Sequence, residues 1–248
     1  MLSILFVALL QAGHDHTPEA DSAATHSVNA AMSGRLIETP HLRLTPRRAP
    51  NEGDSARARE IVAELNSGIA RYEDYRVAQR EGYQIFLPNV PQDVYHFTNY
   101  RRAIASAFRF DPSEPSSLLY RKTSDGYELV GAMYTAPKSA SLEQLDERVP
   151  LSVAQWHAHT NICTPRRAEL HRWRETRGGK PLFGPRGAIT TRAKCDAERG
   201  RFFPQLFGWM VHVSSDGVWG HAEGEGASHV EHQGDESDES GVSDQGPG

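Results

Sequence analysis

The spacing of apolar side chains changes along the chain from a helical to a strand-like pattern. Between residues 56 and 81, apolar positions recur every three or four residues, which predicts one long amphipathic helix. Asp54 or Ser55 can cap its start, and Gly82 suits its end. From residue 94 onward, short runs alternate apolar and polar positions instead. This order predicts an α+β protein, in which a long N-terminal helix packs on a mainly antiparallel sheet or on a distorted β-barrel.

The second half of the pattern is a succession of short strands. Residues 94–98 form one run, and residues 118–122 and 127–136 flank Ser124-Asp125-Gly126. Because an Asp-Gly pair suits a tight turn, these two runs predict a β-hairpin. Short helices are expected at residues 100–107 and 141–148, and the last strand at residues 202–213.

The segment from Trp156 to Cys163 carries the most specific chemistry in the chain. As a strand it has a period of two, so His157 and His159 point to one side with Asn161 and Cys163. Two imidazoles on the same side of a strand can share one ion. If the chain has a metal site, we expect it to be centred on this strand.

Two further histidines extend this hypothesis. His212 lies on a later strand with the same facial pattern, and His96 lies on the strand at residues 94–98. We expect His157, His159 and His212 to bind one divalent transition metal, with His96 as a fourth ligand or a neighbouring donor. Imidazole suits iron, copper and zinc, and the sequence does not choose among them.

The metal site leaves the function open between two classes. Three or four imidazoles can leave a coordination position for water or a small-molecule ligand, as a mononuclear metal enzyme requires. The alternative is a non-catalytic binding or structural module whose histidines line a polar pocket. The residues expected beside the histidines, in the pocket or hydrogen-bonded to the ligands, are Asn161, Tyr95, Tyr134 and Glu128.

The two cysteines, Cys163 and Cys195, allow three roles. They can pair in a disulfide if the protein is in an oxidising compartment. Cys163 can instead be a metal ligand beside the histidines, or both can be buried free thiols. Pairing and ligation compete for the same thiol.

Composition divides the chain into a core and two flanks. Residues 13–54 and 217–248 hold few large apolar side chains, which predicts a disordered linker and a disordered tail. The tail is acidic, with eight Asp or Glu and no Lys or Arg from residue 221 onward. Residues 55–216 are expected to form a single globular domain. Within it, residues 166–201 hold eleven Lys or Arg against four acids and predict a basic loop or insertion.

The N-terminus bears on the compartment. Residues 2–10 are an apolar run that is too short to span a membrane but resembles the core of a signal peptide, so residues 1–12 are expected to direct a periplasmic or secreted protein. The run lacks a basic start, which leaves a cytosolic chain as the alternative. No nucleic-acid reader motif is visible, and no nucleic-acid partner or stable membrane insertion is expected. The oligomeric state is left open.

Two resemblances follow from these motifs. His157-Ala158-His159 with the later His212 resembles the metal motifs of cupin β-barrels, although Cys163 stands where that family has a Glu. A longer succession is similar to a family of uncharacterised exported bacterial proteins, and it implies a shared architecture without an activity. Its motifs are Gly82-Tyr83, Tyr95-His96-Phe97-Thr98-Asn99, Asp111-Pro112, Leu118-Leu119-Tyr120, Leu129-Val130-Gly131 and Trp156-His157-Ala158-His159.

Overall fold

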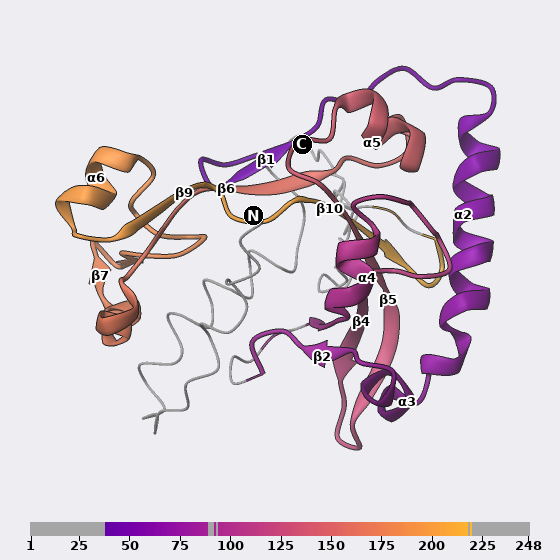
Figure 1. Ribbon diagram of the computed structural model, residues 1–248, viewed down its shortest axis with the longest axis horizontal. Coiled ribbons are helices and arrows are strands. Elements are labelled where there is room, and N and C mark those ends of the chain that lie inside the picture. The colour runs from indigo at the N-terminus through magenta and orange to yellow at the C-terminus, as the bar shows by residue number, and fades with distance from the viewer. Residues whose placement is uncertain (1–37, 89–91, 93, 218, 220–248) are drawn as a thin grey trace, which may run out of the picture.

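The computed structural model describes residues 38–88, 92, 94–217 and 219 (Figure 1). The expected signal peptide, most of the expected linker and nearly all of the acidic tail lie outside these residues. The part of the expected linker that is described includes a strand, β1 (Leu42–Leu44), which pairs with the histidine strand β6 (His157–Thr164). The elements are β1 (Leu42–Leu44), α2 (Asp54–Ile69), η2 (Ala70–Tyr72), α3 (Tyr75–Arg80), β2 (Gln84–Ile85), β3 (Val94–Thr98), α4 (Tyr100–Ala105), β4 (Ser117–Lys122), β5 (Tyr127–Ala136), α5 (Leu142–Arg148), β6 (His157–Thr164), η3 (Arg167–Arg174), β7 (Thr176–Arg177), β8 (Lys180–Pro181), α6 (Arg192–Ala197), β9 (Arg201–Gln205) and β10 (Trp209–Ser214).

An eight-stranded antiparallel sheet forms the centre of the molecule. Its strand order is β1-β6-β10-β5-β4-β3-β2, and β9 pairs separately with β6. The α+β class and the antiparallel sheet are therefore confirmed. The barrel alternative is wrong, because the two end strands β1 and β2 of the described sheet do not pair with each other.

Helix α2 covers one face of this sheet (Figure 1). Its buried side chains recur every three or four residues, at Ala58, Ile61, Leu65 and Ile69, which places them on one side of the helix. They belong to the same buried cluster as side chains of β4, β5 and β10, so this face of the sheet is the main hydrophobic core. The residues of that face include Leu118, Tyr120, Ala132, Tyr134, Val211 and Val213.

The single long helix expected over residues 56–81 is wrong. The chain instead forms α2, a 3₁₀ turn and the short helix α3. Asp74 has an extended backbone and accepts a hydrogen bond from the backbone N–H of Arg76, so it caps a new helix and interrupts the old one. Apolar spacing continues across this break because both helices face the same sheet, which is why the pattern alone predicted one helix.

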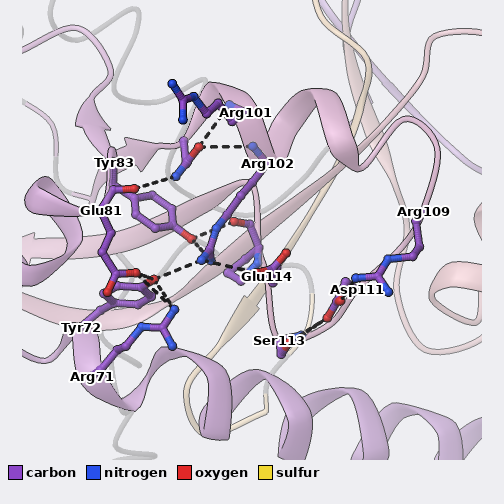
Figure 2. A network of polar contacts seen from close by, with 12 residues as sticks. Arg71, Tyr72, Glu81, Tyr83, Arg101, Arg102, Arg109, Asp111, Ser113 and Glu114 are labelled. Atoms are coloured by element: carbon purple, nitrogen blue, oxygen red, sulfur yellow. Dashed lines mark hydrogen bonds and ion pairs between the residues drawn. The ribbon is translucent and has the colours of Figure 1, made fainter.

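A polar network holds the broken helix against α4 and the edge of the sheet (Figure 2). The guanidinium of Arg102 donates hydrogen bonds to the hydroxyls of Tyr83 and Tyr72, at 2.7 and 3.2 Å. Tyr72 donates in turn to Glu81. The side chain of Asn99 accepts from the first backbone N–H groups of α4 and so caps it. Tyr83 and Asn99 both belong to the motifs of the exported-protein resemblance, and both have structural roles here.

Most shorter elements agree with expectation, but the last strand expected at residues 202–213 is divided into β9, which pairs with β6, and β10, which pairs chiefly with β5. The hairpin of β4 and β5 closes through a hydrogen bond from the backbone N–H of Thr123 to the carbonyl of Gly126. Gly126 has φ of 147°, a conformation that suits glycine. Ser141 and Gln144 form a reciprocal capping box at the start of α5.

The basic segment 166–201 is more ordered than the expected loop. It holds η3, the small hairpin β7–β8 and α6, and it projects from the end of the sheet that lies away from α2 (Figure 1). A second buried cluster stabilises it, made of Cys163, Leu182, Phe183, Ile189 and Cys195.

Candidate metal centre

Four histidines gather on the face of the sheet opposite α2. His157 and His159 lie on β6, His212 on β10 and His96 on β3. Direct cross-strand partners share a face, and the pairs Met210↔His157 and Met133↔His212 place β6, β10 and β5 in one register. The neighbouring residues Tyr95, Val211 and Ala158 alternate to the other side and pack in the main core.

The curvature of the sheet brings the outer histidine to the others. Between β3 and β10 lie β4 and β5, so His96 and His212 are separated by three strand spacings. In a flat sheet this would be about 14 Å. Their Nε2 atoms are nevertheless 3.4 Å apart, because the histidine face is the concave side of the sheet. The same four residues on a flat sheet would not meet.

The separations of the imidazole rings fit a shared ion. Ring centres are 5.3 Å apart for His96 and His212, 5.1 Å for His157 and His212, and 5.8 Å for His157 and His159. Two imidazoles bound tetrahedrally with metal–nitrogen distances of about 2.05 Å have nitrogens about 3.3 Å apart and ring centres about 5.2 Å apart. Rotation of a ring about its Cβ–Cγ bond moves the nitrogens but hardly moves the ring centre. The centres of these three neighbouring pairs are therefore already spaced for coordination.

The ligand atoms themselves are not yet arranged as a complete set. Within the described residues, no three His, Cys, Asp or Glu side chains form a ready-made group for a metal ion. His96 and His212 instead face each other through their Nε2 atoms, as in a hydrogen bond between one N–H and one lone pair. For a third imidazole to reach the same ion as His96 and His212, the ring of at least one other histidine must rotate.

Burial keeps all four imidazoles neutral. Their exposed fractions lie between 2% and 8%. Burial, the largest cause, lowers the pKa of His157 to about 3 and those of His96 and His159 to about 4, and it lowers the pKa of His212 well below its usual value. A second cause adds to the effect, because a positive charge on one of these rings would disfavour a positive charge on the neighbouring histidines. Neutral imidazole is the form that binds metals.

Two buried nitrogens of this cluster lack a hydrogen-bond partner. They are the Nδ1 atoms of His96 and His157, which are buried and have no hydrogen bond among the described residues. Leaving such an atom unpaired costs about 1–3 kcal/mol. A ligand bound at either nitrogen would recover that cost.

The other expected pocket residues lie elsewhere. Tyr95 and Tyr134 alternate onto the core face, where the hydroxyl of Tyr134 donates to the carbonyl of Pro112. Glu128 forms an exposed ion pair with Arg121. Asn161 donates to the carbonyl of Pro40 at the outer side of β6. Their placement beside the histidines was wrong, because strand alternation or distance along the strand takes each of them away.

Cys163 is taken out of the histidine face by a local change of backbone. Asn161 has φ of 53°, a left-handed conformation that interrupts the alternation of β6 after His159. Cys163 then forms a disulfide with Cys195 on the side of the basic segment. The disulfide prediction is confirmed, and ligation by Cys163 is excluded. Because the disulfide is buried, it fits a protein of an oxidising compartment such as the periplasm or the extracellular space.

Four side chains around the histidines were missed in the sequence. Met210 and Met133 are the cross-strand neighbours named above, and both are buried. Phe207 lies edge-on to His159, with ring centres 6.3 Å apart, and Phe86 lies edge-on to Phe207 at 6.0 Å. The signal for Met210 was available, since it alternates with His212 on one strand. Nothing in the sequence relates Phe86 to Phe207.

A hollow elsewhere on the molecule does not involve the histidines. It has a volume of about 560 Å³. It is open to solvent and lined by residues that include Arg57, Phe108, Pro137 and Arg148. None of the described helices is long and apolar enough to cross a membrane.

Comparison of the chain with family models, with curated proteins and with solved structures finds no match. The two family resemblances therefore stay predictions. The closed barrel that a cupin would require is not formed by the described strands.

Proposed function

We propose that His96, His157, His159 and His212 bind one transition-metal ion, with iron, copper and zinc as the candidates. The observation that carries the proposal is a row of four buried, neutral imidazoles from three strands, in which neighbouring rings (His96 and His212, His212 and His157, His157 and His159) have centres 5.1–5.8 Å apart. A polar cluster of this kind is costly to bury unless its atoms are paired, and the unpaired Nδ1 atoms of His96 and His157 add to that cost. An ion would offset it.

The most exposed part of the cluster is its aromatic rim. His159 is the most exposed of the four at 8%, and it adjoins Phe207, which is 39% exposed. Phe86 packs edge-on against Phe207, and its backbone N–H donates a hydrogen bond to the carbonyl of His96. An ion, water or a small molecule could enter beside this aromatic pair.

A second candidate function is a non-catalytic structural module. The contact between the Nε2 atoms of His96 and His212 favours it, because 3.4 Å also suits a weak hydrogen bond within a metal-free polar core. In that case the histidines would fix the curvature of the sheet by pairing with one another.

Metal analysis separates the two functions. The protein, prepared without a His-tag and dialysed, is incubated in turn with Fe(II), copper and Zn(II), and bound metal is measured per chain. We expect one ion per wild-type chain and less than a tenth of that in His157→Ala/His159→Ala. The matched control is His171→Ala, because His171 is exposed on η3 and outside the cluster. Equal metal content in all three proteins would refute the metal site and leave the structural module.

A further inference from the structure

The ligand set of the candidate centre carries no negative charge. Among the described residues, no Asp or Glu contributes to the pKa shifts of the four histidines, and the only side chains that do contribute are other histidines. Cys163, the one thiolate candidate, is bound in a disulfide. A divalent ion would therefore bring two uncompensated charges into the buried site. Since the cost of burying an ion rises with the square of its charge, a monovalent ion costs about a quarter as much.

Two thioethers lie on the same concave face as the imidazoles. Met210 is directly opposite His157 across the β6–β10 pair, and Met133 is directly opposite His212 across the β5–β10 pair. Side chains at such positions start about 4.5–5.5 Å apart at Cβ and reach one another easily. Both methionines are buried, at 6% and 8% exposure, so their sulfurs are shielded from water. Each therefore lies beside one of the histidines.

From these two observations we infer that the centre prefers copper in its monovalent state, Cu(I), with the thioether of Met210 or Met133 completing an imidazole ligand set. The inference rests on the proposed function, and it names the ion of that site and its charge. Thioether and imidazole ligands are both suited to Cu(I), and because Cu(I) is a softer ion than Zn(II) or Fe(II), a thioether favours it over them. A buried site with neutral ligands and soft donors is matched to a soft ion of low charge. Binding alone is inferred, so no electron transfer is required.

The chain offers a matched set of variants to test the thioethers. Met133→Leu/Met210→Leu removes both sulfurs while nearly conserving side-chain volume, so the fold should be kept. Leu118→Met is the control, because it makes the converse change on β4 but on the opposite, core face of the sheet. Far-UV circular dichroism and urea unfolding report whether each variant folds as the wild type does.

The experiment measures two affinities in parallel under anaerobic conditions. Cu(I) is titrated in competition with the chelator bicinchoninate, and Zn(II) in competition with a fluorescent chelator. We expect wild-type protein to bind one Cu(I), and the double methionine variant to bind Cu(I) at least tenfold more weakly with a change of less than threefold for Zn(II). Leu118→Met should match the wild type for both ions. X-ray absorption of the copper-loaded protein should show sulfur scattering that the double variant lacks.

The possible failures are distinct. A Cu(I) affinity that is unchanged in the double methionine variant overturns the thioether ligands. Binding of Zn(II) or Fe(II) that is lost in His157→Ala/His159→Ala, together with Cu(I) binding no tighter than Zn(II), overturns the preference for Cu(I) but leaves the metal site standing. Absence of binding for every ion tested overturns the proposed function and the inference with it.

Discussion

Acidification of the metal-free protein should unfold it through the buried histidines. Burial holds the folded-state pKa of His96 and His159 at about 4 and that of His157 at about 3, and it holds that of His212 well below its usual value. In the unfolded chain each imidazole has a pKa of about 6.5. The unfolded state therefore binds more protons between pH 6.5 and 4, and stability is full above pH 6.5 and is lost as the pH falls.

The size of the effect at pH 5 depends mainly on the unfolded chain. At pH 5, protonation of an imidazole with a pKa of about 6.5 lowers the free energy of the unfolded chain by about 2 kcal/mol. An imidazole that stays neutral in the fold lowers the free energy of the folded state by almost nothing. Four such groups amount to a loss of about 8 kcal/mol between pH 8 and pH 5. Since domains of this size are stable by about 5–15 kcal/mol, the metal-free protein should be close to unfolding at pH 5.

The assay is urea unfolding after chelation of metal, followed by tryptophan fluorescence at pH 8, 7, 6 and 5. Trp156 and Trp209 are both buried and should report the transition. His96→Gln removes one buried imidazole, so its loss of stability from pH 8 to pH 5 should be smaller than that of the wild type by about 2 kcal/mol. His171→Gln, outside the cluster, should keep the full wild-type loss.

The difference between wild type and His96→Gln is the decisive quantity, because carboxylates contribute equally to both. If that difference is below about 1 kcal/mol, which is the precision of linear extrapolation for such a protein, the imidazoles are not held neutral by the fold. The reasoning about burial would then be refuted. Addition of a bound metal should move the whole loss to lower pH, since the ion competes with protons for the same nitrogens.

Three further changes test the scaffold by urea unfolding. Replacement of Cys163 and Cys195 by Ser opens a loop with a sequence separation of 32 residues. The free energy of unfolding should fall by about 4 kcal/mol, because the unfolded chain is no longer constrained. A urea midpoint that is unchanged when the wild-type disulfide is reduced would contradict this. Gly131→Ala would place a Cβ 2.3 Å from the carbonyl oxygen of Val213, so we expect a loss of about 3 kcal/mol, and wild-type stability would show that β5 and β10 can separate there. Leu65→Ala empties a fully buried position between α2 and the sheet and should cost about 2–5 kcal/mol, whereas a loss under about 1 kcal/mol would mean that α2 packs loosely.

Local patterns in the sequence determined much of the scaffold. Alternation predicted β3 with its observed bounds and also the hairpin of β4 and β5, because the period of a strand decides which side chains can share a face. The same reasoning placed His157, His159 and His212 toward one side. The break between α2 and α3 and the change of backbone within β6 were not visible in this way. The cap at Asp74 and the left-handed conformation of Asn161 change the backbone without changing the apolar pattern.

The composition of the candidate centre was decided by tertiary structure. Which strands are neighbours, and how far the sheet bends, depends on contacts between residues far apart in the chain. The concave face brings His96 to 3.4 Å from His212 across three strand spacings, and it brings Met133 and Met210 beside the histidines. The sequence by itself therefore determined that imidazoles lie on strands and face one way. Only the curved sheet decided that four of them meet in a buried, uncharged site, because that depends on packing across the whole core.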